Sequence, residues 1–363
     1  KTCFVENGVP YIKMYNLRNQ KIDFAYHPQY ITEEVHNGKL QRSRTEVGDL
    51  IMNIVGPPLG KLAIIPTTLP QANFNQAAVL IRPYKFKEVL VSYLKVYLEE
   101  MSEINSIATR GSAGQVNISL TQSQNMRIPI PPLNEVRRII EEVSKYDILI
   151  DSLKQNITDI QNLIAYTKSK ILDLAIHGKL VPQDPNDEPA IELLKRINPD
   201  FTPCDNGHYT QLPEGWAICK MKQITSITNG KSQKNVETLN GIYPIYGSGG
   251  VIGRANQYLC IAGSTIIGRK GTINNPIFVE EHFWNVDTAF GLKANDAILD
   301  KYLYYFCLSF DFSKLDKSTA MPSLTKTSIG NVLIPIPPYK EQERIVAKID
   351  MVLDTMNEIL RAV

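Results

Sequence analysis

Two stretches of this sequence repeat one phrase, IPIPPLNEVRRI at residues 128–139 and IPIPPYKEQERI at residues 334–345. Eight of the twelve positions are identical, at a constant offset of 206 residues. The paired prolines exclude helix at that point, so each phrase closes an extended segment. Acidic residues follow, Glu135 in the first copy and Glu341 and Glu343 in the second, and they suit the positive end of a helix dipole. The repeat therefore predicts two copies of one unit, each ending in a helix.

The segment after the first phrase predicts a long helix that belongs to a coiled coil. From Val136 to Leu174, steps of three and four place apolar residues at eleven of twelve positions, and Gly178 ends the helix. A matching stripe follows the second phrase. We therefore expect the helices of 134–176 and 340–363 to pair in antiparallel orientation within one chain. The predicted seam consists of Ile139, Val143, Ile150, Leu153, Ile157, Ile160, Ile345, Ile349, Val352 and Met356.

Upstream of each phrase the two halves share a fainter pattern. GDLIMNIVG (48–56) is echoed by GSTIIGRKG (263–271), and NFNQAAVLI (73–81) is echoed by WNVDTAFGL (284–292). Between these stretches lie short β-branched runs broken by Gly, Asn and Pro, which predict strands and turns. The expected fold is therefore α+β, with two β-rich globular domains joined by two long antiparallel coiled-coil helices.

This pattern also sets the expected domain boundaries. The two globular domains cover 1–133 and 201–333, a long helix plus a loop covers 134–200, and the final helix covers 334–363. LPEGW (212–216) precedes the strands of the second domain and has no counterpart before those of the first, so about twenty residues are expected to be missing at the N-terminus. The last helix is short beside its twin and is also expected to be incomplete.

Bulk composition indicates a globular, cytoplasmic protein. The chain has 363 residues, of which 43% are hydrophobic, and no apolar run approaches the ~18–20 residues that a membrane span needs. Its five cysteines form no CxxC pair, so they predict neither a zinc site nor a disulfide framework. A net charge of +2 does not by itself indicate a nucleic-acid binder.

Three strings resemble catalytic or nucleotide-binding motifs, and each lacks an essential feature. GSGGVIG (247–253) does not have the GxGxxG spacing, and GPPLGK (56–61) is one residue short of a P-loop and lacks its hydroxyl. IPPY (336–339) lacks the polar first residue of the adenine amino-methyltransferase motif, because Ile336 and its counterpart Ile130 cannot accept a hydrogen bond. The five histidines show no metal-ligand spacing. We therefore predict no catalytic centre and no metal site.

The remaining chemistry lies in polar loops of both globular domains, which combine Lys or Arg with Asn, Gln, Ser, Thr and Gly. Arg can pair with guanine and Asn or Gln with adenine, while Lys, Ser and backbone amides bind phosphate. An ordinary solvated surface is the alternative for any one loop, but their occurrence on both domains favours DNA binding. The candidate DNA-binding residues are Arg42, Arg44, Asn73, Asn75, Arg110, Gln115, Lys231, Lys234, Ser248, Arg269, Lys270, Asn274 and Lys326.

Over essentially its whole length the chain resembles the specificity subunit of type I restriction-modification systems. The two IPIPP phrases, EQERIVAKI (341–349) and ILDLAIHGKLVPQDPNDEPAIELL (171–194) carry the resemblance. It implies two target recognition domains, each reading one half of a bipartite asymmetric DNA sequence, and helices that set the unread spacer. Modification subunits, expected to be two, dock on the helices, and restriction subunits complete the complex. S-adenosylmethionine is expected in the modification subunits, and no cofactor is expected in this chain.

Two other functions stay open from the sequence. The chain could be a coiled-coil scaffold with two protein-binding domains, or it could contain a catalytic domain of unrecognised type. A gel-shift experiment with random DNA duplexes would separate DNA binding from the scaffold function. The recognised DNA sequence depends on loop geometry, which the sequence alone does not provide.

Overall fold

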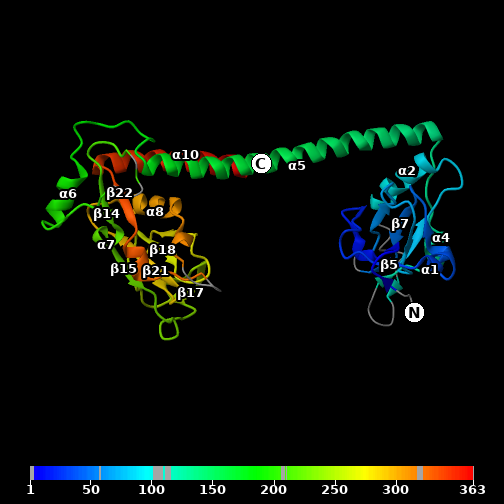
Figure 1. The fold of residues 1–363 in the computed structure, drawn as a ribbon, viewed down its shortest axis with the longest axis horizontal. Helices are drawn as coiled ribbons and strands as arrows, with labels where there is room; N and C mark the ends of the chain where they lie inside the picture. The colour runs from blue at the N-terminus through cyan, green and yellow to red at the C-terminus, as the bar shows by residue number, and fades with distance from the viewer. Residues whose placement is uncertain are drawn as a thin grey trace. The chain divides into compact units, whose positions relative to one another are not determined.

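The computed structural model describes residues 4–56, 59–100, 109–110, 116–205, 209, 211–316 and 322–362. The chain divides into two compact units, unit 1 (1–154) and unit 2 (155–363). The division falls inside helix α5 (Leu133–Ile176), which has 44 residues and therefore begins in unit 1 and ends in unit 2 (Figure 1). The helix predicted over 134–176 is confirmed.

Unit 1 is built from short strands and a few helices. Among its described residues, the helices before α5 are α1 (Glu33–Asn37), α2 (Lys87–Glu100) and α4 (Leu120–Gln124), with 3-10 turns η1 (Met14–Asn16) and η2 (Gln41–Ser43). Its strands are β1 (Phe4–Val5), β2 (Val9–Ile12), β3 (Leu17–Arg18), β4 (Lys21–Ile22), β5 (Tyr30–Ile31), β6 (Arg44–Thr45), β7 (Leu50–Asn53), β8 (Val55–Gly56), β9 (Leu62–Ile64), β10 (Ala72–Phe74), β11 (Ala78–Ile81), β12 (Thr109–Arg110) and β13 (Val116–Asn117).

Unit 2 repeats this plan with longer strands. The helices described after α5 are α6 (Ala190–Ile197), α7 (Met221–Ile224), α8 (Asp300–Ser309), α9 (Lys326–Gly330) and α10 (Tyr339–Ala362), together with the 3-10 turn η3 (Phe312–Leu315). Its strands are β14 (Ala217–Lys220), β15 (Thr225–Asn229), β16 (Tyr243–Gly247), β17 (Gly250–Ala255), β18 (Ser264–Gly268), β19 (Ile277–Val279), β20 (Trp284–Asn285), β21 (Ala289–Ala294) and β22 (Leu333–Ile336).

The central strand pairings of the two units correspond. In unit 1, β10 runs parallel to β2, and β7 pairs antiparallel with both β11 and β9. In unit 2, β20 runs parallel to β16, and β18 pairs antiparallel with both β21 and β19. Since the same mixed topology appears twice, the internal repeat predicted from the sequence is a repeat of fold.

Matching side-chain contacts support the same correspondence. The Tyr93 hydroxyl donates to Pro129 O over 2.8 Å, and the Tyr302 hydroxyl donates to Pro335 O over 2.9 Å. These two contacts join α2 and α8 to the first and second IPIPP phrase. Ser119 and Thr325, again 206 residues apart, cap the N-termini of α4 and α9.

The core of each unit includes residues from a long helix. In unit 1, Val136 of α5 is buried with Leu50 and Leu94, from β7 and α2. In unit 2, Ile345 and Ile349 of α10 are fully buried and belong to the main core cluster. The phrase after each IPIPP therefore anchors its helix to a globular core before the helix extends beyond it.

Within unit 2, α10 lies beside the C-terminal part of α5 (Figure 1). The order of contacts is antiparallel, because Lys168 Nζ lies 3.5 Å from Asn357 Oδ1 while Leu172 and Ala175 share a core with Ile349. Ile164 and Met356 are each only 8% exposed. The expected antiparallel helix pair is thus present in this part of the chain.

Over the middle of α5, residues of the predicted seam are exposed in the described structure. Ile150 is 46% exposed and Leu153 is 53% exposed, and the neighbouring Ile148 is 71% exposed. Among the described residues, the contacts of α10 with α5 involve the C-terminal part of α5, where Lys168 reaches Asn357 and Leu172 shares a core with Ile349. Periodicity predicts which side of a helix is apolar, but not how far a partner extends along it.

Candidate nucleic-acid interface

In unit 2, the ends of several strands bring polar loops together. Lys231 follows β15, and its backbone N–H donates to Asn285 O over 2.9 Å. Arg269 follows β18, and its backbone N–H donates to Thr288 O over 2.7 Å. Because Asn285 ends β20 and Thr288 lies between β20 and β21, the loops after β15 and β18 both lie beside that connection.

Two further loops join the same group. The Leu324 N–H donates to Arg269 O over 2.8 Å, which places the segment leading into Lys326 beside the loop after β18. A Cβ at Gly268 would lie 1.9 Å from Thr272 O, so only glycine fits there. It would also lie 3.2 Å from Ser248 Cβ, so the β16–β17 turn passes close to the same loop. We call this group the unit 2 loop cluster; it comprises residues 230–235, 247–250, 268–272, 285–289 and 322–326.

The cations of the loop cluster are exposed. They are Lys231, Lys234, Arg269, Lys270 and Lys326. Within the described part of the chain no ion pair joins them to a carboxylate, whereas Lys293 elsewhere in unit 2 is paired with Asp300 at 2.5 Å. Exposed cations without a fixed counter-charge, set among backbone amides and a serine, can hold phosphate oxygens of a nucleic acid.

Asn274 needs a correction. Its side chain is exposed, but Nδ2 donates to Asp311 Oδ1 over 2.8 Å and Oδ1 accepts from the Phe312 N–H over 2.7 Å. Hydrogen bonds from Ser313 and from Asn274 hold the pKa of the Asp311 carboxyl below its ordinary value. Because both ends of the amide are engaged, Asn274 holds η3 in place rather than presenting a free edge to a base.

In unit 1, the predicted residues Arg42, Arg44 and Asn73 come together, with unequal access to solvent. Arg42 is exposed on η2, whereas Arg44 is half-buried and its Nε donates to His36 O over 3.0 Å. Asn73 is fully buried, and its Nδ2 donates to Leu40 O over 2.8 Å and to Ser43 Oγ over 2.9 Å. The predicted DNA contact of Asn73 is therefore corrected to a supporting role: it holds the turn that carries Arg42.

The other predicted residues of unit 1 are less well placed or lie outside the description. Asn75 is half-buried, and its Oδ1 is buried without a hydrogen-bond partner among the described residues. Arg110 lies in β12, and its side chain falls outside the described part of the structure, as does Gln115 altogether. Arg42 is thus the one predicted cation of unit 1 whose described side chain is exposed.

Sequence reasoning missed the residues that organise the loop cluster. Thr288 O accepts the backbone N–H groups of both Arg269 and Lys270, at 2.7 and 3.3 Å. These contacts use a backbone carbonyl, so no side-chain type signals them. The pairing of Gly268 with Ala289 in the β18–β21 ladder fixes the geometry, and only knowledge of that register could have revealed it.

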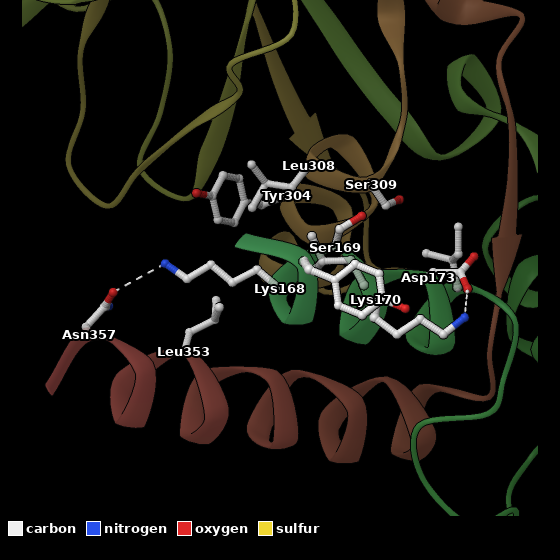
Figure 2. A pocket seen from close by; sticks show the side chains of 12 residues that line it. Lys168, Ser169, Lys170, Asp173, Tyr304, Leu308, Ser309, Leu353 and Asn357 are labelled. Atoms are coloured by element: carbon white, nitrogen blue, oxygen red, sulfur yellow. Dashed lines mark hydrogen bonds and ion pairs between the residues drawn. The ribbon is translucent and has the colours of Figure 1, made fainter. Parts of the chain in front are cut away.

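A cavity of about 820 Å³ lies between α5, α8 and α10 of unit 2 (Figure 2). Its cations are partnered: Lys170 pairs with Asp173 at 3.2 Å, and Lys168 reaches Asn357 (Figure 2). Leu353 and Leu308 supply apolar lining. Since its lysines already have partners, this cavity is a poorer phosphate site than the unit 2 loop cluster.

Other kinds of site find little support in the described residues. Among them, no group of three or more His, Cys, Asp or Glu side chains could hold a metal ion. Burial raises the pKa of the Cys260 thiol to about 12 and that of Cys219 and Cys307 well above the ordinary value, which opposes formation of a thiolate nucleophile. Across the same residues, the structure contains no helix with the length and apolar character of a membrane span.

Comparison with known proteins identifies the repeat. A family model described as "Type I restriction modification DNA specificity domain" matches residues 2–162 and 213–363. The type I restriction enzyme EcoAI specificity subunit of Escherichia coli is 25% identical in an alignment of 338 positions, and the match covers 69% of this chain. The match spans 57% of the length of that E. coli subunit.

Solved structures share the fold. The HsdS subunit from Thermoanaerobacter tengcongensis aligns with a TM-score of 0.60 at 17% identity, covering 99% of this chain and 85% of that one. A chain from a structural study of complex assembly and conformational transition in a type I restriction-modification system aligns with a TM-score of 0.65 at 20% identity. That alignment covers 99% of this chain and 86% of the other.

Proposed function

The chain belongs to the family of the type I restriction modification DNA specificity domain, and from this premise we propose that each of its two units reads one half of a bipartite, asymmetric DNA target. One observation carries the proposal: the two units repeat one topology with matched contacts, yet differ in the side chains of their polar loops. Two domains with the same fold and different loops suit the recognition of two different DNA sequences.

In unit 2 the proposed contacts fall into two kinds. Lys231, Lys234 and Lys326 are exposed cations suited to phosphate, which positions the protein without reading sequence. Arg269 is the residue best suited to read a base, because a guanidinium can pair with guanine through two hydrogen bonds. In unit 1 the exposed Arg42 has the corresponding role.

Methylation mapped across the genome tests this division, in cells that carry the chain with its modification subunits. Replacing Arg269 by alanine should relax one position in one half of the target and cost about 1–3 kcal/mol, while Lys231→Ala should weaken binding to all sequences alike. Arg42→Ala should alter only the other half. Lys195→Ala, an exposed change on α6, is the control and should leave the target unchanged. A change in one unit that altered both halves together would contradict the proposal.

We also propose that the chain performs no catalysis and that S-adenosylmethionine binds to the modification subunits. The IPPY string supports this, since Ile336 is a fully buried residue of β22, paired with Ala217, and offers no acceptor to an adenine amino group. Purified chain, DNA and S-adenosylmethionine should give no methyl transfer. Transfer by a preparation shown by mass spectrometry to lack modification subunit would overturn this part of the proposal.

The proposed complex contains two modification subunits and, for cleavage, restriction subunits, with α5 setting the length of the unread spacer. A four-residue insertion adds about one turn, or ~6 Å, to a helix, which equals roughly two base pairs at ~3.4 Å each. The exposed stretch around Ile150 tolerates the insertion better than the packed stretch around Ile164.

The spacer is expected to change by one to two base pairs while both half-sites stay the same. Replacing four residues of the same stretch without changing its length is the control. An active complex whose spacer is unchanged by the insertion would show that the modification subunits set the distance.

A further inference from the structure

The connection that follows β2 in unit 1 is much longer than the corresponding connection in unit 2. Strand β2 pairs antiparallel with β5, and residues 13–29 join the two strands. Strand β16 pairs antiparallel with β17, and residues 248–249 join those. The two connections correspond, because β2 and β16 also pair in parallel with β10 and β20. Since 248–249 belong to the unit 2 loop cluster, the long connection leaves its strand at the equivalent place in unit 1.

Hydrogen bonds hold the long connection in one shape. Asn16 is fully buried; its Oδ1 accepts the Lys13 N–H over 2.9 Å, and its Nδ2 donates to Tyr26 O over 2.7 Å. The Tyr15 hydroxyl donates to His27 O over 3.2 Å. His27 has a φ of 51°, in the left-handed region that is uncommon for residues other than glycine. Such backbone persists where surrounding contacts determine it, so the connection presents its side chains from a fixed position.

Three aromatic rings and two cations gather on this connection. The rings of Tyr26 and His27 belong to exposed residues, with centroids 4.5 Å apart and planes inclined at 72°. Tyr15 lies edge-on to both, with centroid distances of 6.2 and 6.1 Å. Arg18 Cζ lies 4.2 Å from the Tyr26 ring centroid, and Lys13 Nζ lies 6.0 Å from that of Tyr15. We call these five residues the unit 1 aromatic cluster, and one continuous segment of the chain forms it.

Part of the Tyr26 ring is available to a ligand. Tyr26 is 42% exposed although Arg18 and His27 lie against it. Aromatic rings beside arginine form the platforms on which proteins stack the bases of single-stranded nucleic acids. Every base has a flat face that can stack in this way, but neighbouring base pairs cover that face within a duplex. The cluster therefore suits an unpaired base.

The charges of the connection favour a nucleic acid over a cationic ligand. Residues 13–27 contain Lys13, Arg18 and Lys21 against the carboxylate of Asp23, a formal net charge of +2. Asp23 lies 3.9 Å from Arg18, and both side chains are nearly half exposed, so the pair is weak. A quaternary ammonium ligand, which aromatic rings also bind, would be repelled by these cations. The phosphates on either side of a stacked base would instead be attracted.

We propose that the unit 1 aromatic cluster binds an unpaired base of single-stranded DNA. The base stacks on Tyr26 beside Arg18, and Lys13 and Lys21 attract the flanking phosphates. The corresponding connection of unit 2 consists of Ser248 and Gly249 and carries no ring, so this binding belongs to unit 1. It goes beyond the proposed function, because it uses the face of an unpaired base and not the edges of base pairs in a duplex.

The test measures binding of the whole chain to a fluorescein-labelled single strand of ~16 thymidines by fluorescence anisotropy. An abasic strand of equal length, with the same phosphates, is the comparison. Stacking of one base contributes about five- to 150-fold in affinity, so the thymidine strand should bind at least about fivefold more tightly than the abasic strand. Tyr26→Ala should weaken thymidine binding by a similar factor and leave abasic binding unchanged, whereas Tyr26→Phe keeps the ring and should bind like the parent.

Two more variants test the site without relying on Tyr26. Arg18→Gln removes the cation over the ring and should also weaken binding of the thymidine strand. Tyr84→Ala, which removes another fully exposed tyrosine of unit 1, is the matched control and should leave binding unchanged. Circular dichroism of each variant should match that of the parent, because the replaced side chains are exposed.

Three results would overturn the proposal. Equal affinity for the thymidine and abasic strands would show contact with phosphate alone. Thymidine binding that Arg269→Ala abolishes and Tyr26→Ala leaves intact would place the contact in the unit 2 loop cluster. A proline-rich peptide that binds to the cluster when the thymidine strand does not would show a protein ligand. Each result would leave the proposed reading of duplex DNA standing, since methylation mapping of the Arg269 and Arg42 variants does not involve Tyr26.

Discussion

Replacing Glu341 by alanine is expected to destabilise unit 2 by about 1–3 kcal/mol, because a half-buried donor loses its acceptor. Glu341 is 1% exposed and accepts from Trp216 Nε1 at 3.0 Å and from Gln183 Nε2 at 2.8 Å. Gln183 is exposed and can turn to water, so it adds little to the cost. Trp216 is half-buried, so water replaces its lost bond only in part.

The glutamine variant separates the hydrogen bond from the charge. Burial raises the pKa of the Glu341 carboxyl above its ordinary value near 4.5, despite the hydrogen bonds from Gln183 and Trp216. The folded state therefore holds this proton more tightly than the unfolded state, and the resulting stability is lost as pH rises through the folded pKa. Glu341→Gln keeps an acceptor for Trp216 and carries no charge. Relative to the parent, it should become more stable as pH rises from acid to neutral.

Urea unfolding followed by tryptophan fluorescence measures both effects, since both tryptophans, Trp216 and Trp284, lie in unit 2. Glu343→Ala, an exposed change two residues further along α10, is the control and should cost less than ~0.5 kcal/mol. Equal stability of Glu341→Ala and Glu343→Ala would refute the buried hydrogen bond. A difference between Glu341→Gln and the parent that does not vary with pH would refute the raised pKa.

Two further predictions follow from burial. Ile349→Asp places an unpaired charge in the core of unit 2 and should cost about 3–5 kcal/mol in urea unfolding. Leu153→Asp, at an exposed position, should cost less than ~0.5 kcal/mol, and similar costs for the two variants would contradict this difference in burial. Burial of Asp49 opposes its charge, but hydrogen bonds from Arg82 and Lys87 lower the pKa of its carboxyl overall. The contribution of Asp49 to stability is therefore present at neutral pH and is lost as the pH falls through the pKa of the folded state. Asp49→Asn should therefore destabilise unit 1 at neutral pH and reduce its acid sensitivity, as measured by circular dichroism; an unchanged acid transition would contradict this.

Periodicity and repetition in the sequence predicted the frame of the fold closely. The expected helices of 134–176 and 340–363 are Leu133–Ile176 and Tyr339–Ala362, because heptad spacing and prolines act locally. The extent of the pairing was not predictable in the same way. Whether Leu153 is covered depends on which distant residues lie against it, and its own surroundings in sequence do not encode this.

The residue types of the candidate site could be predicted from the sequence, but whether each side chain is free to contact DNA could not. Asn73 has the right chemistry to read adenine, yet it is buried because Leu40 and Ser43, some thirty residues away in sequence, fold onto its amide. Asn274 is exposed, but Asp311 and Phe312 already occupy both ends of its side chain. A polar side chain can form hydrogen bonds either within the protein, where it holds a loop in place, or to a ligand. Only the tertiary contacts show which of the two it does.

The helix that follows each IPIPP phrase is attached to the core of its unit in a different way. At position 342 in unit 2 a buried glutamine donates to Ala297 O and Pro337 O, both at 3.1 Å, while its counterpart in unit 1 is the buried apolar Val136. A buried amide needs hydrogen-bond partners, whereas a buried valine needs only close packing. In unit 2, Gln342 therefore requires one particular arrangement of the segment before α8, which supplies Ala297 O. The glutamine thus fixes the α10 anchor of unit 2 by hydrogen bonds, and the valine fixes the α5 anchor of unit 1 by apolar contact. The repeated phrase therefore specifies an extended segment and a helix start, and the residues that differ within it determine how each helix is attached to its unit.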